Sequence, residues 1–351
     1  MYKIKPSFSR GLWWIQRGSN PPPRRCERRA LPDELWTHAN NNIISIYLKI
    51  QFHCIIFSEV KIMRIGMMTS DFRRFMSQEE SLQYIKDFGF DVADITLMDA
   101  LDCRQPDKDV FNGDYIKRAH EIREYADKIG LPIVQAHAPF PVHKDNDEEY
   151  DQTMMDILKK CLVVCGILGV KNLIIHPCNN WDYKENATFF KKLLPVAKQN
   201  NVVICTENMW NWDHKNNHAI EAACSSPEDF LKHIEEVNDD YLQACVDVGH
   251  ANMMSFVSKT TTPGNMVRVL NNHVKCFHFH DNDGIHDSHE MLFTMSLDWG
   301  DLTKAIKDIH FDGDLIMEVL DFKGRTLEQI IERSKQLYKE ARKLASMIEN
   351  K

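Results

Sequence analysis

Several familiar signatures are missing from this 351-residue chain. None of its ten cysteines stands in a Cys-x-x-Cys pair, so neither a disulfide framework nor a zinc ribbon is indicated. No Gly-x-Gly-x-x-Gly and no Gly-Lys-Ser/Thr loop occurs, which argues against a nucleotide-binding fold of either common type. We therefore expect the cysteines to be buried, reduced thiols and the protein to be cytoplasmic.

Positive charge is also scarce over most of the chain. Residues 63–351 carry 33 Lys and Arg against 47 Asp and Glu, whereas residues 1–62 carry 10 against 4, and the formal net charge is −8. Nucleic-acid binding draws heavily on neutralisation of phosphates by basic side chains. The composition thus makes nucleic acid an unlikely partner and favours a small molecule.

A membrane-spanning segment and a secretory signal are missing too. The most apolar stretch near the start, residues 43–57, is too short and too polar to cross a bilayer. Residues 20–29 are rich in proline and arginine and show no helical or strand period. We expect residues 1–62 to be a non-native or disordered extension of a catalytic domain over 63–351; a basic tail with a separate role is the alternative.

From Met63 onward, strand-like and helix-like segments alternate. Such alternation predicts a parallel sheet, and eight repeats predict a (β/α)8 TIM barrel, with a doubly wound open sheet as the alternative. The expected strands cover residues 65–68, 92–96, 133–137, 173–176, 202–207, 244–248, 276–280 and 315–319. The expected helices cover residues 77–88, 113–129, 148–168, 184–199, 227–237, 263–272, 298–308 and 325–348.

What the chain does have is a polar residue at the end of most of these strands. A lone histidine in such a place is usually a hydrogen-bonded structural residue, but six of the eight strands end this way. In a barrel these ends open on one face, and buried carboxylates crowded there need a cation. The residues are His137, His176, Glu207, Asp247, His250, His280 and Glu318, with Asp287 and His289 in the loop after the seventh strand.

The motifs around these residues resemble those of the xylose-isomerase-like barrel superfamily. That superfamily holds sugar isomerases, epimerases and family 2 apurinic endonucleases. The resemblance runs from Met63 to about Phe322 and rests on motifs that are weak singly but specific in this order. They are His-Ala-Pro at 137–139, Ile-His-Pro at 175–177, Glu-Asn at 207–208, Asp-x-Gly-His at 247–250, His-x-His-Asp-Asn at 278–282, Asp-x-His at 287–289 and Met-Glu-Val at 317–319.

The resemblance implies a metal-dependent sugar or sugar phosphate isomerase or epimerase. In the epimerases of the superfamily two glutamates, an aspartate and a histidine hold one divalent ion (Mn, Mg, Co or Zn). By motif these are Glu207, Asp247, His280 and Glu318. It further implies that Glu207 and Glu318 form the acid/base pair of a reaction through an enediolate, and that the barrel associates as a homo-oligomer.

Two alternatives remain at this stage. In the endonucleases nine residues hold three zinc ions, and the matching positions add His137, His176, His250, Asp287 and His289, which otherwise bind substrate. A non-catalytic barrel that binds a small ligand is the other alternative. Two tryptophans after the fifth strand, Trp210 and Trp212, favour carbohydrate because indole rings stack on sugar rings. The resemblance also predicts an arginine where His286 stands, which puts a ketohexose substrate in doubt.

Overall fold

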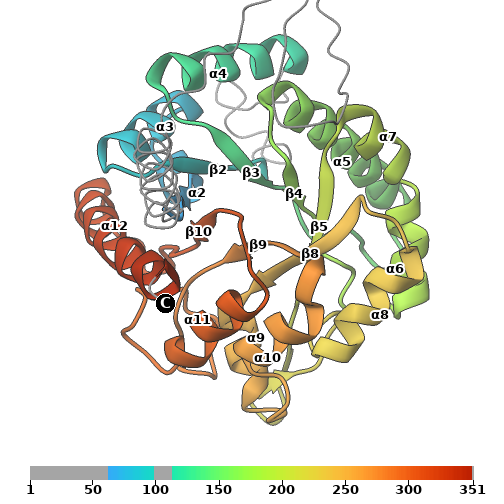
Figure 1. Cartoon of the computed structure of the whole chain (residues 1–351). Coiled ribbons are helices and arrows are strands. Elements are labelled where there is room, and N and C mark those ends of the chain that lie inside the picture. Colours follow the sequence, from blue (N-terminus) through green and yellow to red (C-terminus); the bar gives the residue numbers. More distant parts are fainter. Residues whose placement is uncertain (1–61, 99–112, 350–351) are drawn as a thin grey trace, which may run out of the picture. The chain divides into compact units, whose positions relative to one another are not determined.

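The computed structural model of the chain describes residues 62–98 and 113–349, all within one compact unit, Lys61–Lys351. The extension predicted for residues 1–62 lies outside the described residues except at its last position. Within the described part, parallel strands stand at the centre and helices surround them (Figure 1). No helix there is long and apolar enough to cross a membrane.

Eight parallel strands form the barrel, as the sequence predicted. The hydrogen-bonded order is β10-β1-β2-β3-β4-β5-β8-β9. The two ends of this order meet where the amide of Phe279 donates to the Ile316 carbonyl oxygen at 2.9 Å and the amide of Glu318 donates to the Phe279 carbonyl oxygen at 3.0 Å. The strands are β1 (Ile65–Met68), β2 (Val92–Thr96), β3 (Ile133–His137), β4 (Asn172–Ile174), β5 (Val203–Glu207), β8 (Leu242–Asp247), β9 (Val274–His278) and β10 (Leu315–Met317).

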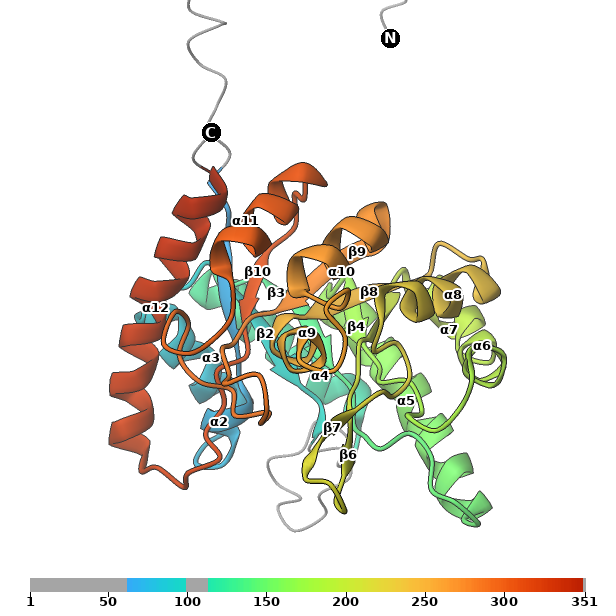
Figure 2. The same cartoon turned by 90° about the horizontal axis from the view of Figure 1, so that it is seen from below.

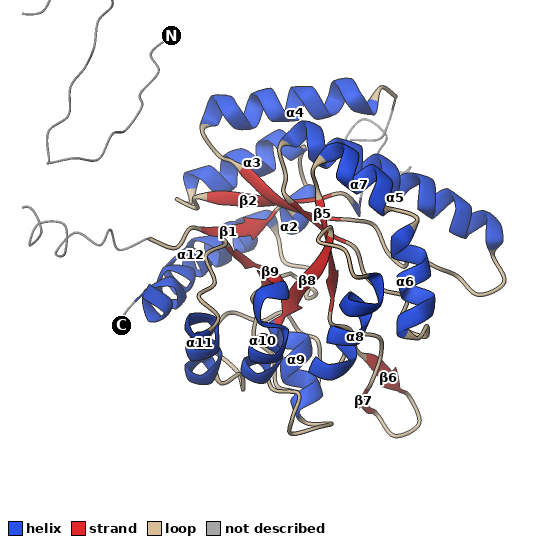
Figure 3. Cartoon of the chain, turned by 45° about the vertical axis from the view of Figure 1, so that its right-hand side comes forward, coloured by secondary structure: helices blue, strands red, loops and turns tan. Residues whose placement is uncertain are grey.

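Helices cover the outside of this barrel (Figures 2 and 3). Their starts and stops follow local chemistry: the Ser226 side chain accepts a hydrogen bond from the Asp229 amide to start α8, and Gly130 ends α4 with a left-handed φ of 65°. The helices are α2 (Ser70–Arg73), α3 (Gln78–Asp87), α4 (Tyr115–Ile129), α5 (Glu148–Leu168), α6 (Tyr183–Lys191), α7 (Leu194–Asn200), α8 (Pro227–Val237), α9 (Val248–Ser255), α10 (Pro263–Leu270), α11 (Trp299–Asp308) and α12 (Leu327–Glu349).

Several features differ from the sequence prediction, among them two short helices that it lacked, α2 and α9. The helix expected over residues 184–199 is two helices, α6 and α7, because Pro195 has no amide hydrogen for an unbroken ladder and instead opens α7. An unpredicted antiparallel hairpin, β6 (Asn211–Asp213) with β7 (His218–Ile220), follows β5. It projects beyond the barrel in Figure 2. Its position brings Trp212 to the mouth of the cavity described below.

A layer of small side chains fills the barrel interior beneath the strand ends. Cys205, Cys245 and Cys276 pack there with Ile174, each at most 2% exposed. The described cysteines are free thiols, as expected. Because alternate residues of a strand share a face, the residues two positions after the three cysteines lie in the next layer toward the mouth of the barrel. Each of these three residues is a candidate metal ligand.

Candidate metal centre

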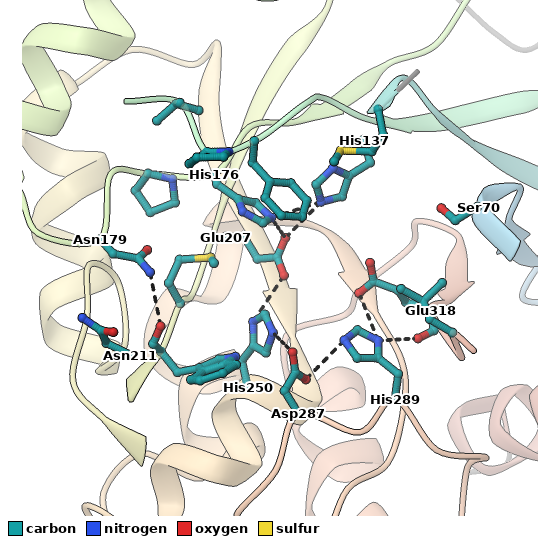
Figure 4. Close-up of a pocket in the computed structure, with 18 of the residues that line it drawn as sticks. Ser70, His137, His176, Asn179, Glu207, Asn211, His250, Asp287, His289 and Glu318 are labelled. Atoms are coloured by element: carbon teal, nitrogen blue, oxygen red, sulfur yellow. Dashed lines mark hydrogen bonds and ion pairs between the residues drawn. The ribbon is translucent and has the colours of Figure 1, made fainter. Parts of the chain in front are cut away.

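The predicted site residues converge on one end of the barrel. Seven of the nine line a single cavity there, and the other two, Asp247 and His280, are fully buried in contact with them. Figure 4 shows the cavity-lining members arranged around Glu207, with His137 and His176 on one side and His250 on another. Residues far apart in the chain therefore meet, as the barrel model requires.

At the centre, three carboxylates surround one imidazole. His278 Nδ1 lies 3.1 Å from Glu318 Oε2 and 3.4 Å from Glu207 Oε2. With Asp247, these residues place four ligand-type atoms within 4.8 Å of one another. All four side chains are buried, Glu318 being the most exposed at 6%. This group is called the central set below.

The histidine of the central set is His278, whereas the sequence prediction assigned His280, and direct binding of the ion by His280 stays a prediction. Strand register accounts for the place of His278: β9 pairs with β8 so that His278 stands opposite Asp247. β9 ends at His278, and the next residue pairs with Met317 to close the barrel. In a His-x-His sequence the two imidazoles share a face by strand periodicity, so only the register decides which one joins the carboxylates.

His280 also contacts Asp247. Its Nε2 lies 3.1 Å from both carboxylate oxygens of Asp247, and its ring stacks on His289 with centroids 3.8 Å apart. A Cβ at Gly249 would come within 2.0 Å of the His280 ring, so the Asp-Val-Gly-His motif needs a glycine there. The position of His280 is that of a residue that orients a ligand carboxylate.

Asp94 and Gln135 flank the central set, and sequence reasoning missed both. Asp94 Oδ2 accepts a hydrogen bond from the Gln135 side-chain amide at 2.7 Å and lies 3.8 Å from His278 Nε2. Burial raises the pKa of Asp94. A carboxylate on the far nitrogen is a common device for fixing the ring of a metal-binding histidine. The available signal was a polar residue inside each of two otherwise apolar strands.

Glu207 connects the central set to a pair of histidines. Its Oε2 lies 3.4 Å from His176 Nε2 and 3.8 Å from His137 Nε2, and these two nitrogens are 3.1 Å apart. His137, Glu207 and His278 form a further group of ligand-type atoms within 4.8 Å. Glu207 therefore stands where it could serve more than one cation.

A third group lies on the other side of Glu207. Asp287 stands between two imidazoles, with Oδ2 at 3.3 Å from His250 Nε2 and Oδ1 at 3.2 Å from His289 Nε2. These residues, together with His280, again bring four ligand-type atoms within 4.8 Å of one another. His250 Nδ1 is also 3.4 Å from Glu207 Oε1, so the three groups are continuous.

The electrostatics of these groups match a cation site. Burial alone would raise the pKa of Glu207, but His278 and His176 outweigh it and hold that pKa well below its usual value. Burial would likewise lower the pKa of His278, but Glu318 and Glu207 raise it well above the ordinary value. In His137, burial and the neighbouring His176 lower the pKa to about 4. The site thus combines ionised carboxylates with one imidazole that is already neutral at pH 7.

The donor set fits a divalent metal ion. Buried polar atoms without a hydrogen-bond partner among the described residues include Glu207 Oε2 and both ring nitrogens of His278. Carboxylates crowded in a buried space cost free energy unless a cation compensates them. Carboxylate oxygens with an imidazole nitrogen suit Zn, Mn and Co, and oxygen-rich sets also suit Mg. The central set would hold such an ion.

The cavity above the central set has a volume of about 1180 Å³. Aromatic rings form much of its wall, including both predicted tryptophans, Trp210 and Trp212. Amide side chains add hydrogen-bonding groups: Asn179 and Asn211 lie across the cavity from Glu318 in Figure 4. A wall of this kind suits a small ligand with hydroxyl groups and apolar ring faces.

Cationic groups contribute little to this wall. Among the described residues that line the cavity, the Lys and Arg side chains are Arg73 and Arg74. Arg74 Nη1 lies 2.8 Å from Asp321 Oδ2, and Arg73 Nη1 donates to the Met76 carbonyl oxygen at 2.6 Å. Both guanidinium groups are therefore engaged by the protein itself.

Comparison with known proteins agrees with the motifs and the barrel. Residues 82–345 match the model of a family described as xylose isomerase-like TIM barrel. The chain belongs to this family. The xylose isomerase-like TIM barrel assignment thus rests on a match over most of the chain.

Individual members of the family are only distantly similar to it. An uncharacterised protein of Methanocaldococcus jannaschii is 24% identical over 64% of this chain and 74% of its own length. A probable endonuclease 4 of Metamycoplasma arthritidis is also 24% identical, over 47% of this chain and 59% of its own length. The crystal structure of a D-tagatose 3-epimerase-like protein superposes with a TM-score of 0.61 and 19% identity, covering 81% of this chain and 98% of that one. At such identities the structural likeness shows the fold.

Proposed function

We propose that this protein is a divalent-metal-dependent isomerase or epimerase of an uncharged carbohydrate. The observation that carries the proposal is the central set, in which Glu207, Asp247 and Glu318 surround His278 at the mouth of the barrel. Similarity to a D-tagatose 3-epimerase-like protein supports it. A divalent ion held by the central set would polarise a substrate carbonyl and stabilise the negative charge of an enediolate.

Two of the three carboxylates are placed to move protons. Glu207 and Glu318 line the cavity. Asp247 does not line it and is completely buried, at 0% exposure. Burial alone would raise the pKa of Glu318, but the neighbouring His278 has the larger, opposite effect. The pKa of Glu318 therefore lies below its usual value, as does that of Glu207. Both are therefore ionised at neutral pH and can accept a proton.

The proton balance is simple. One carboxylate removes the proton from the carbon that bears a hydroxyl group beside the substrate carbonyl, and the electron pair moves to the carbonyl oxygen. Return of a proton to the same carbon from the opposite face gives the epimer. Return to the former carbonyl carbon, with a hydroxyl proton transferred between the two oxygens, gives the aldose–ketose isomer. Glu207, at the end of β5, and Glu318, directly after β10, are the proposed pair.

The substrate is proposed to be unphosphorylated because the cavity wall offers little to bind a phosphate. Phosphate sites are built from unpaired guanidinium or ammonium groups, or from helix N-termini. The two arginines in the described wall are engaged by Asp321 and by the Met76 carbonyl. Asn179, Asn211 and the aromatic rings are better suited to hydroxyl groups and carbon-bound hydrogens.

Solvent deuterium incorporation tests the proposal. Pentoses, hexoses and inososes would be incubated in D₂O with protein loaded with Mn²⁺, Co²⁺ or Mg²⁺, and exchange at carbon followed by NMR. We expect at least one sugar to exchange. Glu207→Gln and Glu318→Gln should each lower the rate by roughly a hundredfold or more, the scale of general acid–base catalysis.

A matched variant separates this effect from a general loss of charge. Glu290 pairs with Lys323 and Arg333 and does not line the cavity, so Glu290→Gln should exchange normally. Metal content would be measured for every variant, since Glu207 and Glu318 belong to the central set. Full activity in either glutamine variant would eliminate the proposed acid/base pair.

A second candidate function has a specific observation in its favour. The three contiguous groups of ligand-type atoms would suit three zinc ions, and one similar protein is a probable endonuclease 4. Cleavage of abasic DNA would require roughly three zinc ions per chain, together with nicking of an abasic duplex. The acidic chain and its scarcity of cavity-lining cations weigh against it, because DNA binding relies on basic side chains.

The protein is also proposed to act in the cytoplasm. Cys165, Cys178, Cys205, Cys224, Cys245 and Cys276 are free thiols. Thiols persist unpaired in reducing compartments, whereas secreted proteins tend to oxidise them.

A further inference from the structure

An aromatic collar surrounds the mouth of the cavity. It consists of Phe140, Trp210, Trp212 and Phe322, all of which line the cavity. Phe140 follows β3, the two tryptophans follow β5 and belong to or adjoin the β6–β7 hairpin, and Phe322 follows β10. Because β3, β5 and β10 are separated around the barrel, the four rings approach the cavity from three directions.

The collar lies directly against the imidazoles of the metal centre. Phe140 stacks on His176, with centroids 4.5 Å apart and planes at 20°. Phe322 meets His289 edge to face at 5.2 Å and 89°. A molecule bound to the central set would therefore reach the collar if it is larger than the part that contacts the metal ion.

The tryptophans of the collar also lie beside histidine rings. The Trp210 ring centroid is 6.4 Å from that of His250 and 6.3 Å from that of Trp212, with interplanar angles of 69° and 82°. Trp212 in turn stacks against His286 with centroids 6.0 Å apart. His286 occupies the position where the resemblance predicts an arginine. The outer wall here is thus built of flat rings in place of a cation.

Protein packing does not account for the two phenylalanines of the collar. Phe140 is 42% exposed and Phe322 is 64% exposed, whereas Trp210 and Trp212 are partly buried against Ala219, Met253 and Met254. Exposed aromatic rings gathered at the rim of a polar cavity are typical of a ligand-binding surface. The cavity volume of about 1180 Å³ also exceeds the range of roughly 300–1,000 Å³ usual for small-molecule sites. A single sugar ring held at the central set would leave the collar unfilled.

We infer that the substrate is a neutral two-ring saccharide. Its carbonyl-bearing sugar occupies the central set, and a second ring, joined to it by a glycosidic bond, stacks in the collar. The inference deepens the proposed function and rests on it for the placement of the first ring. The second ring contributes binding energy through its apolar face and takes no part in the chemistry.

The test compares glycosides that differ by one ring. Full-length protein loaded with Mn²⁺ would be titrated calorimetrically with methyl and phenyl glycosides of 3-ketoglucose and 3-ketogalactose, which carry a ring carbonyl, in both anomeric forms. In at least one pair we expect the phenyl glycoside to bind about tenfold more tightly, a difference of ~1.4 kcal/mol. Equal affinity in every pair, or no measurable binding of any member, overturns the inference.

Variants show whether the collar causes the difference. Trp212→Ala and Phe140→Ala should each bring the two affinities of that pair to within about threefold. Bound metal and thermal midpoint, measured for each variant, show whether the barrel and its metal remain intact. Phe256→Ala is the control, because Phe256 is 65% exposed but does not line the cavity. A tenfold preference that survives both collar substitutions overturns the inference.

Deuterium exchange separates this inference from the proposed function. Reducing disaccharides such as maltose and cellobiose should exchange with higher kcat/KM than glucose, and Trp212→Ala should remove that advantage chiefly through KM. Exchange with monosaccharides alone, without any preference for phenyl glycosides, would overturn the two-ring substrate and leave the isomerase standing. A phenyl preference without exchange of any sugar would overturn the isomerase and retain the collar as a binding site.

Discussion

At the scale of single residues, the roles of His278 and His280 differ although they stand two positions apart in one motif. His278 faces two carboxylate oxygens through Nδ1 and Asp94 through Nε2. His280 faces Asp247 and stacks on His289. The first is placed to bind a cation directly, and the second is placed to hold a carboxylate ligand in position.

This difference predicts unequal effects of substitution on metal affinity. Loss of a supporting residue typically weakens binding by roughly 10–100-fold, and loss of a direct ligand should cost more. We therefore expect His278→Ala to weaken Mn²⁺ binding more than His280→Ala, as measured by competition with a chelator. His120→Ala, on the exposed face of α4, is the matched control. A larger effect of His280→Ala would restore the original sequence assignment.

The sequence predicted which residues meet at the site better than it predicted the role of each residue. Polar residues at strand ends predicted seven of the nine that converge, because barrel geometry fixes where strand ends go, and the loop after the seventh expected strand supplied the other two. The choice between His278 and His280 depended on strand register, which no local pattern encodes. Asp94 escaped notice because it stands inside a strand and not at its end.

At the scale of elements, three strands have the bounds that the sequence predicted: Ile65–Met68, Val92–Thr96 and Ile133–His137. Other strands, such as β4 and β10, end before the polar residue that had been counted in them. The β6–β7 hairpin has only three residues in each strand, too few for a periodic signal. Its turn is fixed by Asp213, which accepts hydrogen bonds from the amides that follow it.

One ion pair joins neighbouring helices and gives a pH-dependent prediction. Arg118 of α4 holds both carboxylate oxygens of Glu79 on α3, one of them at 2.6 Å. Burial would raise the pKa of Glu79, but Arg118 outweighs it and the pKa is lowered. A carboxyl whose pKa is lower in the folded state stabilises the fold above its unfolded pKa and loses that contribution as the pH falls through its folded pKa.

Glu79→Gln should therefore lower the free energy of unfolding at pH 7 by about 1 kcal/mol, and by less as the pH falls below the ordinary range for glutamate. Urea denaturation of metal-free protein at pH 7 and at acid pH would measure it. Glu124→Gln, at an exposed position of α4, should change neither value. A loss that is the same at both pH values would show that the ion pair is not its cause.

At the scale of the whole molecule, the barrel closes within the described residues. Phe279 joins β9 to β10, and α12 packs on the outside near β1 and β10. Inside the barrel, the layer that contains Cys205, Cys245 and Cys276 lies beneath the layer that contains the candidate metal ligands. Self-association, expected from the resemblance, stays a prediction that light scattering would check.

Deletion of residues 1–62 should leave the fold and the metal content unchanged, because the barrel strands and the central set all lie beyond that segment. The measurement compares thermal midpoint and bound metal for the full chain and for residues 63–351. A fall in midpoint of more than about 4 °C would correspond to at least ~1 kcal/mol of lost stability for a domain of this size. That result would show that the segment contributes to folding.

The central claim is that one divalent ion is shared by groups from four strand ends. Anomalous diffraction from crystals grown with Mn²⁺ tests it most directly. The account predicts a peak in contact with Glu207, Asp247, His278 and Glu318, at metal–ligand distances of roughly 2.0–2.5 Å. A peak bound elsewhere, or none at saturating Mn²⁺, would contradict it.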